Sequence, residues 1–318
     1  MKILALVPEA YGGFGGIARA EADLLDAMSA DSRINSIEVL PRLIRSDSFR
    51  HPDSVQVVRA AARGKLAFAF AALSRSLADW DVVFCGHLNL APLAILLARL
   101  RRRPAILMIH GIDAWEPPSS RLRRWSGRSF DAVISVSHVT ARRFRAWSRV
   151  PAESIRVIPN MIDLSRYAPG DPERGVLEKL DIEQSPYLMT LGRLDTRERY
   201  KGFDEVLEVM PRLLEIEPDL KYVIAGDGDD RPRLEQKAED LGIRRAVRFA
   251  GRVSEEEKLS LYRGARVFVM PSRGEGFGIV ILEALGCGAS VVGSTTDGTR
   301  EALLHGRLGV LVEPENQD

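Results

Sequence analysis

Short apolar runs alternate with longer amphipathic segments along the whole chain, which is the pattern of βαβ units and parallel sheets. In the first half the expected strands are Ile3–Val7, Ser36–Leu40, Val55–Val58, Asp81–Cys85, Ala105–Ile109, Ala132–Val136 and Ile155–Ile158. The alternation then restarts, with strands expected at Tyr187–Leu191, Lys221–Ala225, Val247–Ala250, Val267–Met270, Ala289–Val292 and Gly309–Val312. The pattern predicts an α/β protein with doubly wound parallel sheets.

The restart also predicts two domains. It follows the turn-rich stretches Pro159-Asn160 and Pro169–Pro172. A chain of 318 residues exceeds the roughly 250–300 residues at which a single core stops growing. We therefore expect Rossmann-like domains over residues 1–165 and 166–318, facing each other across a cleft.

Composition excludes several classes of protein. Apolar residues make up 45% of the chain and charged residues 28%, as in an ordinary globular protein. Only Cys85 and Cys287 occur, so neither a disulfide framework nor a cysteine-based metal site is available. No signal peptide is recognisable, and the longest apolar segment, about residues 88–100, falls short of the roughly 20 residues that span a bilayer. A cytoplasmic protein is expected.

The net charge of +1 hides an asymmetry between the halves. Residues 1–165 carry 23 basic and 15 acidic groups, whereas residues 166–318 carry 22 and 29. The arginines of the first half cluster in segments 99–103, 121–128 and 142–145. These are either solvated helix faces or a surface for an anionic membrane or a lipid-linked phosphate, worth about 1 kcal/mol per basic group near the headgroups. No nucleic-acid partner is expected.

A glycine-rich stretch, YGGFGGIARAE at Tyr11–Glu21, follows the first expected strand. Gly13, Gly15 and Ala18 fit the spacing of a dinucleotide-binding turn. Glu38 lies about twenty residues further on, where a ribose-binding acid is expected. An oxidoreductase that uses a nicotinamide cofactor therefore stays open, although four residues separate the strand from the glycines and a dinucleotide turn follows its strand directly.

The run SRGEGFGIVILEALGCG at Ser272–Gly288 is more informative. Gly276 and Gly278 allow a sharp turn against a ligand, and the amide groups at the start of the following helix favour an anion such as a diphosphate. Glu283, about one turn into that helix, can accept hydrogen bonds from a diol. Glu275 stays in the loop, beside whatever is attached to the phosphates.

Two cations follow a different strand of the same expected sheet. Arg193 offers a planar fork to phosphate oxygens, and Lys201 offers a point charge. Together they can neutralise a diphosphate leaving group. Each is unremarkable alone, but the combination with the glycine-flanked helix start favours a diphosphate site.

The second half resembles the nucleotide-sugar-binding domain of retaining glycosyltransferases of the GT-B type, in particular glycosyltransferase family 4. The matching motifs, in order, are Gly192-Arg193-Leu194, Lys201-Gly202, Ala225–Gly228, Phe249–Val253, Pro271-Ser272 and Glu275–Gly278 through Glu283-Ala284. The first half is similar to the family at Gly12-Gly13 with Gly15-Gly16, His110–Asp113, Val133–Ser137 and Ile158–Asp163.

The resemblance implies a role for each matching residue. Arg193 and Lys201 would bind the donor diphosphate, and Glu275 would hold sugar hydroxyls. Further donor-binding residues implied are Gly226, Asp227, Arg252, Gly276, Phe277, Gly278 and Glu283, with Glu283 at the ribose and Arg252 near the base. In the first domain His110 would lie close to the donor sugar, and the loop of Gly13, Gly15 and Gly16 would line the diphosphate and acceptor side.

The function implied is transfer of a hexose from a UDP- or GDP-sugar to a glycan or lipid-linked acceptor, for a cell-surface polysaccharide or glycolipid. No metal or cofactor is expected, because the two cations stabilise the leaving group. A sugar-nucleotide epimerase of the same architecture and a non-catalytic binder stay open. The chain ends at Asp318, where family members usually continue with helices that return to the first domain, so these helices are expected to be missing.

Overall fold

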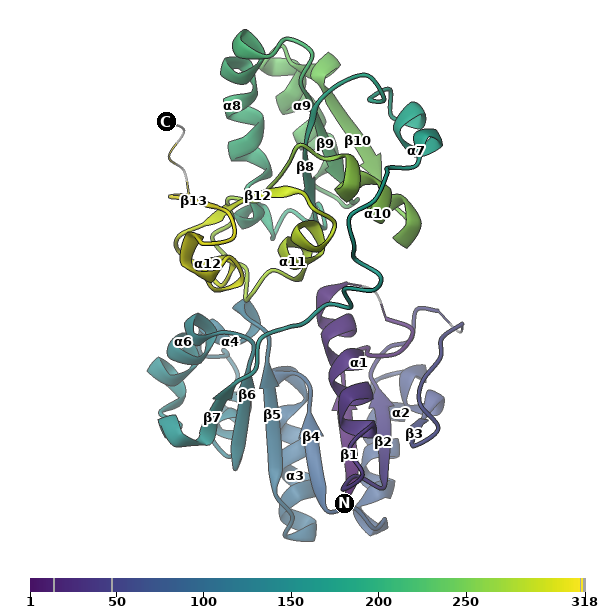
Figure 1. Ribbon diagram of the computed structural model, residues 1–318. Coiled ribbons are helices and arrows are strands. Elements are labelled where there is room, and N and C mark those ends of the chain that lie inside the picture. Colours follow the sequence, from purple (N-terminus) through teal and green to yellow (C-terminus); the bar gives the residue numbers. More distant parts are fainter. Residues whose placement is uncertain (14, 47, 315, 317–318) are drawn as a thin grey trace. The chain divides into compact units, whose positions relative to one another are not determined.

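The computed structural model describes residues 1–13, 15–46, 48–314 and 316. They divide into two compact units, Met1–Asn160 and Met161–Asp318 (Figure 1). The expected boundary between residues 165 and 166 falls in the segment just after this division. Each unit is built around a parallel sheet, and each is described by itself.

Unit 1 contains a seven-stranded sheet in the order β3-β2-β1-β4-β5-β6-β7. Its strands are β1 (Lys2–Val7), β2 (Ser36–Pro41), β3 (Val55–Val57), β4 (Val82–Cys85), β5 (Ala105–Ile109), β6 (Ala132–Ser135) and β7 (Ile155–Val157). All pairs in this sheet are parallel. The central strands are apolar runs, and residues 3–7 of β1 are all buried, because helices cover both faces of such a sheet.

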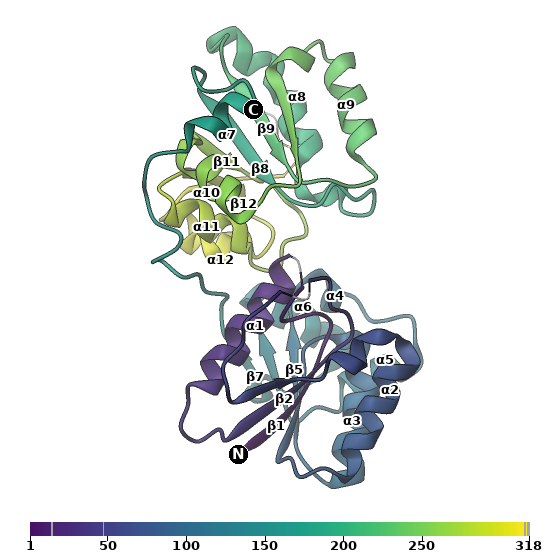
Figure 2. The ribbon, with the colours of Figure 1, turned by 90° about the vertical axis from the view of Figure 1, so that its right-hand side faces the viewer.

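The helices of unit 1 are unequally divided between the two faces. They are α1 (Gly16–Ser29), α2 (Lys65–Ser74), α3 (Ala91–Arg101), α4 (Ile112–Trp115), α5 (Arg121–Gly127) and α6 (His138–Ser148). One core contains side chains from α2, α3 and α6, so these helices share a face of the sheet. Figure 2 shows α1 on the opposite side of the sheet from α2, α3 and α5.

Unit 2 contains a six-stranded parallel sheet in the order β10-β9-β8-β11-β12-β13. Its strands are β8 (Tyr187–Leu191), β9 (Lys221–Ala225), β10 (Val247–Gly251), β11 (Val267–Val269), β12 (Ser290–Ser294) and β13 (Val310–Val312). Its helices are α7 (Arg174–Lys179), α8 (Phe203–Ile216), α9 (Arg231–Asp240), α10 (Glu255–Gly264), α11 (Ile279–Gly286) and α12 (Thr299–Ala302). A separate core joins α8 and α9 to β9.

The fold class expected from the sequence is confirmed, and every expected strand occurs within two residues of its expected bounds. In both sheets successive strands are first added toward one edge, and the chain then returns to the middle and adds the remaining strands toward the other edge. The two sets of strands meet between β1 and β4 in unit 1 and between β8 and β11 in unit 2. Ligands of open parallel sheets bind at such switch points, outside the carboxyl ends of the strands.

Candidate active site

The switch point of unit 2 brings the expected donor residues together. Arg193 and Lys201 follow β8, and Lys201 ends a short 3₁₀ turn at Arg199–Lys201. Glu275 lies in the loop after the neighbouring strand β11. Because the carboxyl ends of parallel neighbours meet at one edge, loops far apart in the sequence supply one cluster of charges.

The cluster contains a carboxylate that the sequence analysis missed. The Nζ of Lys201 lies 3.3 Å from Oε2 of Glu198 and 3.6 Å from Oε1 of Glu275. The guanidinium of Arg193 donates to Glu198 as well. The Lys201 side chain is 15% exposed and that of Arg193 is 73% exposed, so the lysine is held between two acids while the arginine projects into solvent. The acids keep the cations at the sheet edge.

Glycines allow the loops of this edge to approach each other closely. A Cβ on Gly226 would lie 1.9 Å from the carbonyl oxygen of Gly192, and Gly226 has φ +125°. The Gly226 amide donates to the carbonyl oxygen of Gly251 at 2.8 Å, which joins the ends of β9 and β10. Asp227 and Arg252, expected beside the base, are both exposed and follow these two strands. Their part in base binding stays a prediction.

A second missed carboxylate organises the loop that carries Glu275. Asp297 is fully buried and accepts hydrogen bonds from the Ser272 hydroxyl (2.8 Å) and the Glu275 amide (2.9 Å). It also accepts from the amide and hydroxyl of Thr299, at 3.0 and 2.7 Å. Burial raises the pKa of Asp297 to about 6, although these hydrogen bonds act against the rise. The side chain thus ties the loop after β11 to the loop after β12.

The helix α11 begins directly after the glycines that follow Glu275, as the sequence predicts. Gly278 precedes α11 with φ +91°, and a helix of this kind leaves its first amide groups without intrahelical partners. Gly276 and Phe277 are buried, and Phe277 is only 6% exposed. Phe277 therefore packs inside unit 2, whereas the amide groups of the helix start are the part that suits a phosphate.

Glu283 lies in α11, but it is engaged inside the unit. It is 5% exposed, and it accepts hydrogen bonds from Lys258 Nζ and Tyr262 Oη, each at 3.0 Å. Lys258 also donates to the Tyr167 hydroxyl at 3.0 Å. The expected role of Glu283 at a ribose stays a prediction, and a diol would have to share the remaining lone pairs of this carboxylate.

The switch point of unit 1 contains His110 and a third missed acid, Glu21. Nε2 of His110 lies 2.9 Å from the carbonyl oxygen of Gly86 and 3.6 Å from Oε1 of Glu21. Glu21 comes from α1 and is fully buried. Burial raises its pKa to about 7, against the opposing effect of His110. Burial lowers the pKa of His110, but the neighbouring Glu21 outweighs this and the pKa is raised.

A glycine is needed beside this pair. A Cβ on Gly86 would lie 2.0 Å from Oε1 of Glu21, so a larger residue would displace the carboxylate. The amide of Gly86 also donates to the carbonyl oxygen of Leu6 at 2.8 Å, which holds the end of β4 against β1. The position of Glu21 against His110 therefore depends on the missing side chain at Gly86.

The glycine-rich loop of unit 1 combines a tight turn with an open end. A Cβ on Gly13 would lie 2.5 Å from Cβ of Glu9. Gly15 precedes α1 with φ +94°, and among the described residues other than its chain neighbours none has an atom within 4 Å of a Cβ added to it; Gly16 is exposed. The expected role of this loop beside a ligand stays a prediction.

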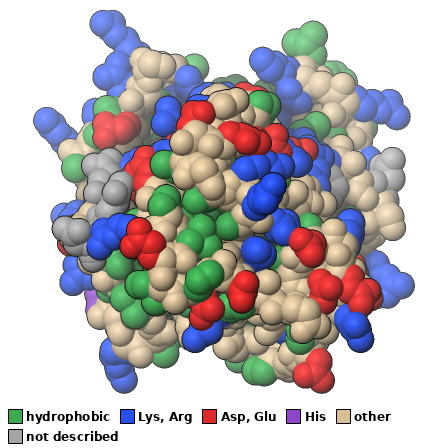
Figure 3. All heavy atoms as spheres, turned by 90° about the horizontal axis from the view of Figure 1, so that it is seen from above, with side chains coloured by type: hydrophobic (Ala, Val, Ile, Leu, Met, Phe, Trp, Pro, Cys, Tyr) green, Lys and Arg blue, Asp and Glu red, His purple; other side chains and the backbone are tan. Residues whose placement is uncertain are grey.

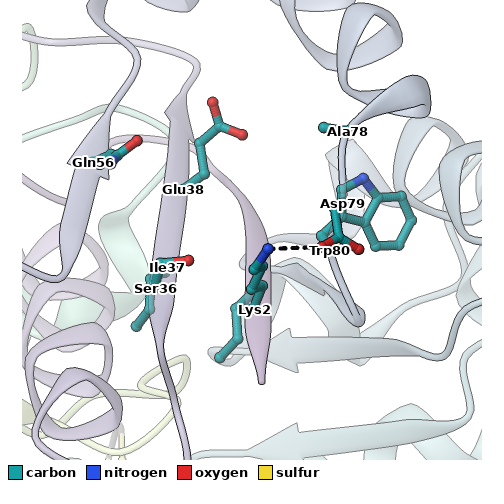
Figure 4. A pocket seen from close by; sticks show the side chains of 9 residues that line it. Lys2, Ser36, Ile37, Glu38, Gln56, Ala78, Asp79 and Trp80 are labelled. Carbon is teal, nitrogen blue, oxygen red and sulfur yellow. Dashed lines mark hydrogen bonds and ion pairs between the residues drawn. The ribbon is translucent and has the colours of Figure 1, made fainter.

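Glu38, the acid of the dinucleotide hypothesis, does not lie at this edge. It is inside β2 and pairs with Arg75 at 2.9 Å. It also lines a pocket beside the first residues of β1 and β2, where Lys2 pairs with Asp79 (Figure 4). A ribose-binding acid belongs at the carboxyl end of its strand, so the structure speaks against the oxidoreductase hypothesis.

Two further findings concern the described ranges 1–13, 15–46, 48–314 and 316. They contain no group of three or more His, Cys, Asp or Glu side chains placed to hold a metal ion. Nor does any helix within them have the length and apolar character needed to cross a membrane.

Comparison with solved structures defines the class of protein. HepE of Anabaena, in complex with UDP and glucose, matches with a TM-score of 0.76 and 21% identity over 100% of this chain and 87% of that chain. The sucrose-phosphate synthase of Thermosynechococcus elongatus matches with a TM-score of 0.80 and 19% identity over the same shares. This likeness shows the fold, which is the GT-B fold of glycosyltransferases.

Sequence comparison gives the family. The family described as Glycosyl transferases group 1 matches residues 177–318, and Glycosyltransferase Family 4 matches residues 17–166. The GDP-mannose-dependent alpha-(1-6)-phosphatidylinositol monomannoside mannosyltransferase of Mycolicibacterium smegmatis is 30% identical over 283 residues, 85% of this chain and 71% of that protein. The glycogen synthase of Mycobacterium tuberculosis is 31% identical over 74% of this chain and 57% of that protein. The chain belongs to glycosyltransferase family 4.

Proposed function

We propose that the protein transfers a hexose from a nucleotide-diphosphate sugar to a glycan or lipid-linked acceptor, with retention of the anomeric configuration. The observation that carries this proposal is the charge cluster at the switch point of unit 2. Lys201 lies there beside Glu275, in the loop that leads into α11, and Glu198 pairs with both Arg193 and Lys201. Fixed cations aimed at a leaving group usually contribute more to such catalysis than any other single effect.

In the proposed reaction the donor diphosphate binds Arg193, Lys201 and the amide groups at the start of α11. The bond between the anomeric carbon and the diphosphate breaks while the acceptor hydroxyl attacks from the same face. The departing phosphate oxygen takes the acceptor's proton. His110 positions the sugar and stabilises the charge that develops, rather than acting as an obligatory base.

The acids of the cluster receive two different tasks in this proposal. Glu275 holds sugar hydroxyls, because its carboxylate reaches Lys201 and its backbone is fixed by Asp297. Glu198 holds Arg193 and Lys201 at the edge of the sheet before the donor arrives. Since the diphosphate then competes with Glu198 for the cations, donor binding exchanges one set of ion pairs for another.

The reaction is proposed to need neither a metal nor a cofactor. Arg193 and Lys201 supply the positive charge that a divalent cation would otherwise supply to a diphosphate. Unchanged transfer activity after treatment with a chelator would support a metal-independent reaction. A loss of activity that is reversed only by added Mg²⁺ or Mn²⁺ would refute it.

The names of relatives support two candidate donor bases and a lipid-linked acceptor. The mycobacterial relative is named as GDP-mannose-dependent and as acting on a phosphatidylinositol monomannoside, whereas HepE was crystallised with UDP and glucose. We propose a UDP- or GDP-hexose as donor and an acceptor used for a cell-surface polysaccharide or glycolipid. A cytoplasmic location, at the inner face of the membrane, would follow from such an acceptor.

Thermal shift with a panel of UDP- and GDP-sugars, and with NAD as a control, tests the proposal. A ligand that binds only the folded state raises the melting temperature. The nucleotide-sugar that does so is then incubated alone and with candidate acceptors, and the anomeric configuration of the product is read by NMR. Conversion of the nucleotide-sugar to another nucleotide-sugar in the absence of an acceptor would favour an epimerase. Binding of the nucleotide-sugar without any turnover would favour a non-catalytic binder.

A further inference from the structure

The outward surface of α2 is apolar, although it faces solvent. Leu66, Phe70 and Leu73 of α2 are 87%, 76% and 42% exposed, and Leu77 of the following 3₁₀ turn, Arg75–Leu77, is 88% exposed. Their spacing places them along one side of the helix. The opposite side is already occupied by Phe68 and its neighbours in the core of unit 1. Such a helix has two apolar sides, of which only one has a partner within the described part of the unit.

The exposed apolar surface continues onto the neighbouring helices. α3 contacts both α2 and α5, and Figure 2 shows the three helices on the same side of the sheet. The exposed apolar side chains that continue it are Leu96 and Leu100 on α3, and Leu122 and Trp125 on α5. We refer to the exposed surface of residues 59–78, 88–103 and 117–128 as the α2–α3–α5 face.

The three segments of the α2–α3–α5 face carry only basic charges, although the exposed acids Asp79 and Glu116 lie directly beside two of them. Each of its three segments contains four Lys or Arg residues and no Asp or Glu. Among them, Arg63 lies just before α2, Lys65 is its first residue, and both are exposed; Arg99 lies over the Trp125 ring, 4.4 Å from its centroid. On the surface shown in Figure 3, in contrast, acidic and basic side chains are interspersed. Two of the three arginine clusters noted in the sequence therefore belong to one apolar and basic surface.

We propose that the α2–α3–α5 face docks on an anionic lipid bilayer, with Leu66, Phe70 and Leu77 inserted below the headgroups. Leucine and phenylalanine flanked by arginine and lysine, with a tryptophan at the margin, is the composition of helices that lie in the membrane interface. The basic groups match the negative surface of the bilayer. This inference rests on the proposed function and deepens it, because it names the surface that holds the enzyme at a lipid-linked acceptor.

The charge of the face also argues against a second copy of this chain as the occupant. In a symmetric dimer the same patch meets itself, so two sets of basic side chains would be brought together, and the three segments that carry them contain no acid of their own. The headgroups of an anionic bilayer carry the charge opposite to that of the basic side chains, and its hydrocarbon region can take up the exposed apolar side chains. The bilayer therefore matches both features of the face, whereas a second copy matches only the apolar one.

The test uses the full chain and vesicles of phosphatidylcholine, with or without phosphatidylglycerol. The chain is expected to float with the anionic vesicles and to bind neutral vesicles at least about tenfold more weakly. Rising salt should weaken the binding, because salt screens the attraction between the basic side chains and the anionic headgroups. The triple variant Leu66→Ser, Phe70→Ser, Leu77→Ser should lose about tenfold or more of the partition. All three side chains are exposed, so the variant is expected to fold.

Matched variants on unit 2 provide the controls. Ile216 is 83% exposed at the end of α8, and Ile216→Ser should bind vesicles like the natural chain. The double variant Arg63→Glu, Lys65→Glu should lose the preference for anionic vesicles, whereas Arg245→Glu, Arg307→Glu, which makes the same change in net charge, should retain it.

Equal binding to neutral and anionic vesicles, or full binding by the triple variant, would overturn the proposal. The proposal would also be overturned if the natural chain were a dimer without vesicles and the triple variant were a monomer. Nucleotide-sugar binding is measured in parallel without lipid. A chain that binds its donor but not the vesicles refutes the docking surface alone, and a chain that binds vesicles but no nucleotide-sugar refutes the proposed donor site alone.

Discussion

The Nζ of Lys201 lies 3.6 Å from Oε1 of Glu275, although the two residues follow different strands of the sheet, β8 and β11. This ion pair joins the loop that carries the proposed phosphate-binding cations to the loop that carries the proposed sugar-binding acid. The contact is made by the protein's own side chains. The site of unit 2 is therefore ordered in advance, which reduces the cost of arranging it during the reaction.

Replacement of Lys201 by alanine is expected to lower the rate of transfer by roughly 10²–10³-fold, because a fixed charge is removed from the leaving group. Glu275→Ala is expected to abolish transfer as well. Neither side chain belongs to an apolar core, so melting curves followed by circular dichroism should stay close to that of the natural protein. Initial rates with a nucleotide-sugar donor provide the measurement.

Arg197→Ala is the matched control for Lys201→Ala. Arg197 lies in the same loop, its side chain is 86% exposed, and it pairs with Asp195 rather than with Glu275. Its removal should leave the rate within about twofold, as for most exposed ion pairs. Full activity in both Lys201→Ala and Glu275→Ala would show that the site has been assigned wrongly.

Asp297→Ala is expected to destabilise unit 2 by roughly 2–4 kcal/mol, because buried donors of Ser272, Glu275 and Thr299 lose their shared acceptor. The loop of Glu275 should also become less well fixed, so transfer should fall even at temperatures where the protein remains folded. Denaturant unfolding and initial rates, taken on the same preparation, provide the two measurements.

Asp240→Ala serves as the control for Asp297→Ala. Asp240 is exposed at the end of α9 and accepts a hydrogen bond from Gln236 of the same helix at 2.9 Å. We expect a change within about 0.5 kcal/mol. If Asp297→Ala were equally mild, the loop would not depend on this carboxylate.

The strands could be predicted because they depend on local patterns, whereas the order of the strands in each sheet was found only in the structure. A buried parallel strand is a short apolar run, and β1, β8 and β9 are such runs between clear turn residues. The loops that follow them in a parallel sheet share an edge, which is why Lys201 and Glu275 could be placed together from the sequence.

The acids Glu21, Glu198 and Asp297 could not be predicted from their own segments. Each gains its role from a residue on another element or loop: Glu21 from His110, Glu198 from Arg193 and Lys201, and Asp297 from the loop after β11. Glu21 in particular lies in a helix with alternating acids and alanines, where a solvated acid is the ordinary expectation. Its complete burial is decided by tertiary packing against the residues that follow β4 and β5.

Gly226→Ala is expected to destabilise the protein by roughly 1–3 kcal/mol, because the new Cβ would meet the carbonyl oxygen of Gly192 and because φ at this position is +125°. Relief of the clash would move the loop that carries Arg193, so donor binding should weaken too. Thermal unfolding and nucleotide titration measure the two effects.

Gly175→Ala is the corresponding control. Gly175 lies in α7, and an added Cβ there meets no described atom within 4 Å outside its chain neighbours and its own helix backbone. Alanine should stabilise this helix by roughly 0.5–1 kcal/mol and leave nucleotide binding unchanged. Equal tolerance of alanine at both positions would mean that Gly226 is not required for the close approach of the two loops.

Glu21→Gln is expected to stabilise the protein increasingly as the pH rises from about 5 to about 8. Burial raises the pKa of Glu21 to about 7, above its value in the unfolded chain, so the folded state retains a proton that the unfolded state releases. The stability that this proton provides is present at low pH and is lost as the pH rises through about 7, by at most roughly 1.4 kcal/mol per pH unit. The raised pKa of His110 acts in the same direction, because the folded state also binds the imidazole proton more tightly than the unfolded state does, and this advantage is lost as the pH rises. Glutamine cannot ionise, so the difference in unfolding free energy between Glu21→Gln and the natural protein should grow with pH. Glu183→Gln is the control, because Glu183 is exposed. Its difference in unfolding free energy from the natural protein should not change with pH. Parallel stability curves for Glu21→Gln and the natural protein would show that Glu21 does not titrate in this range.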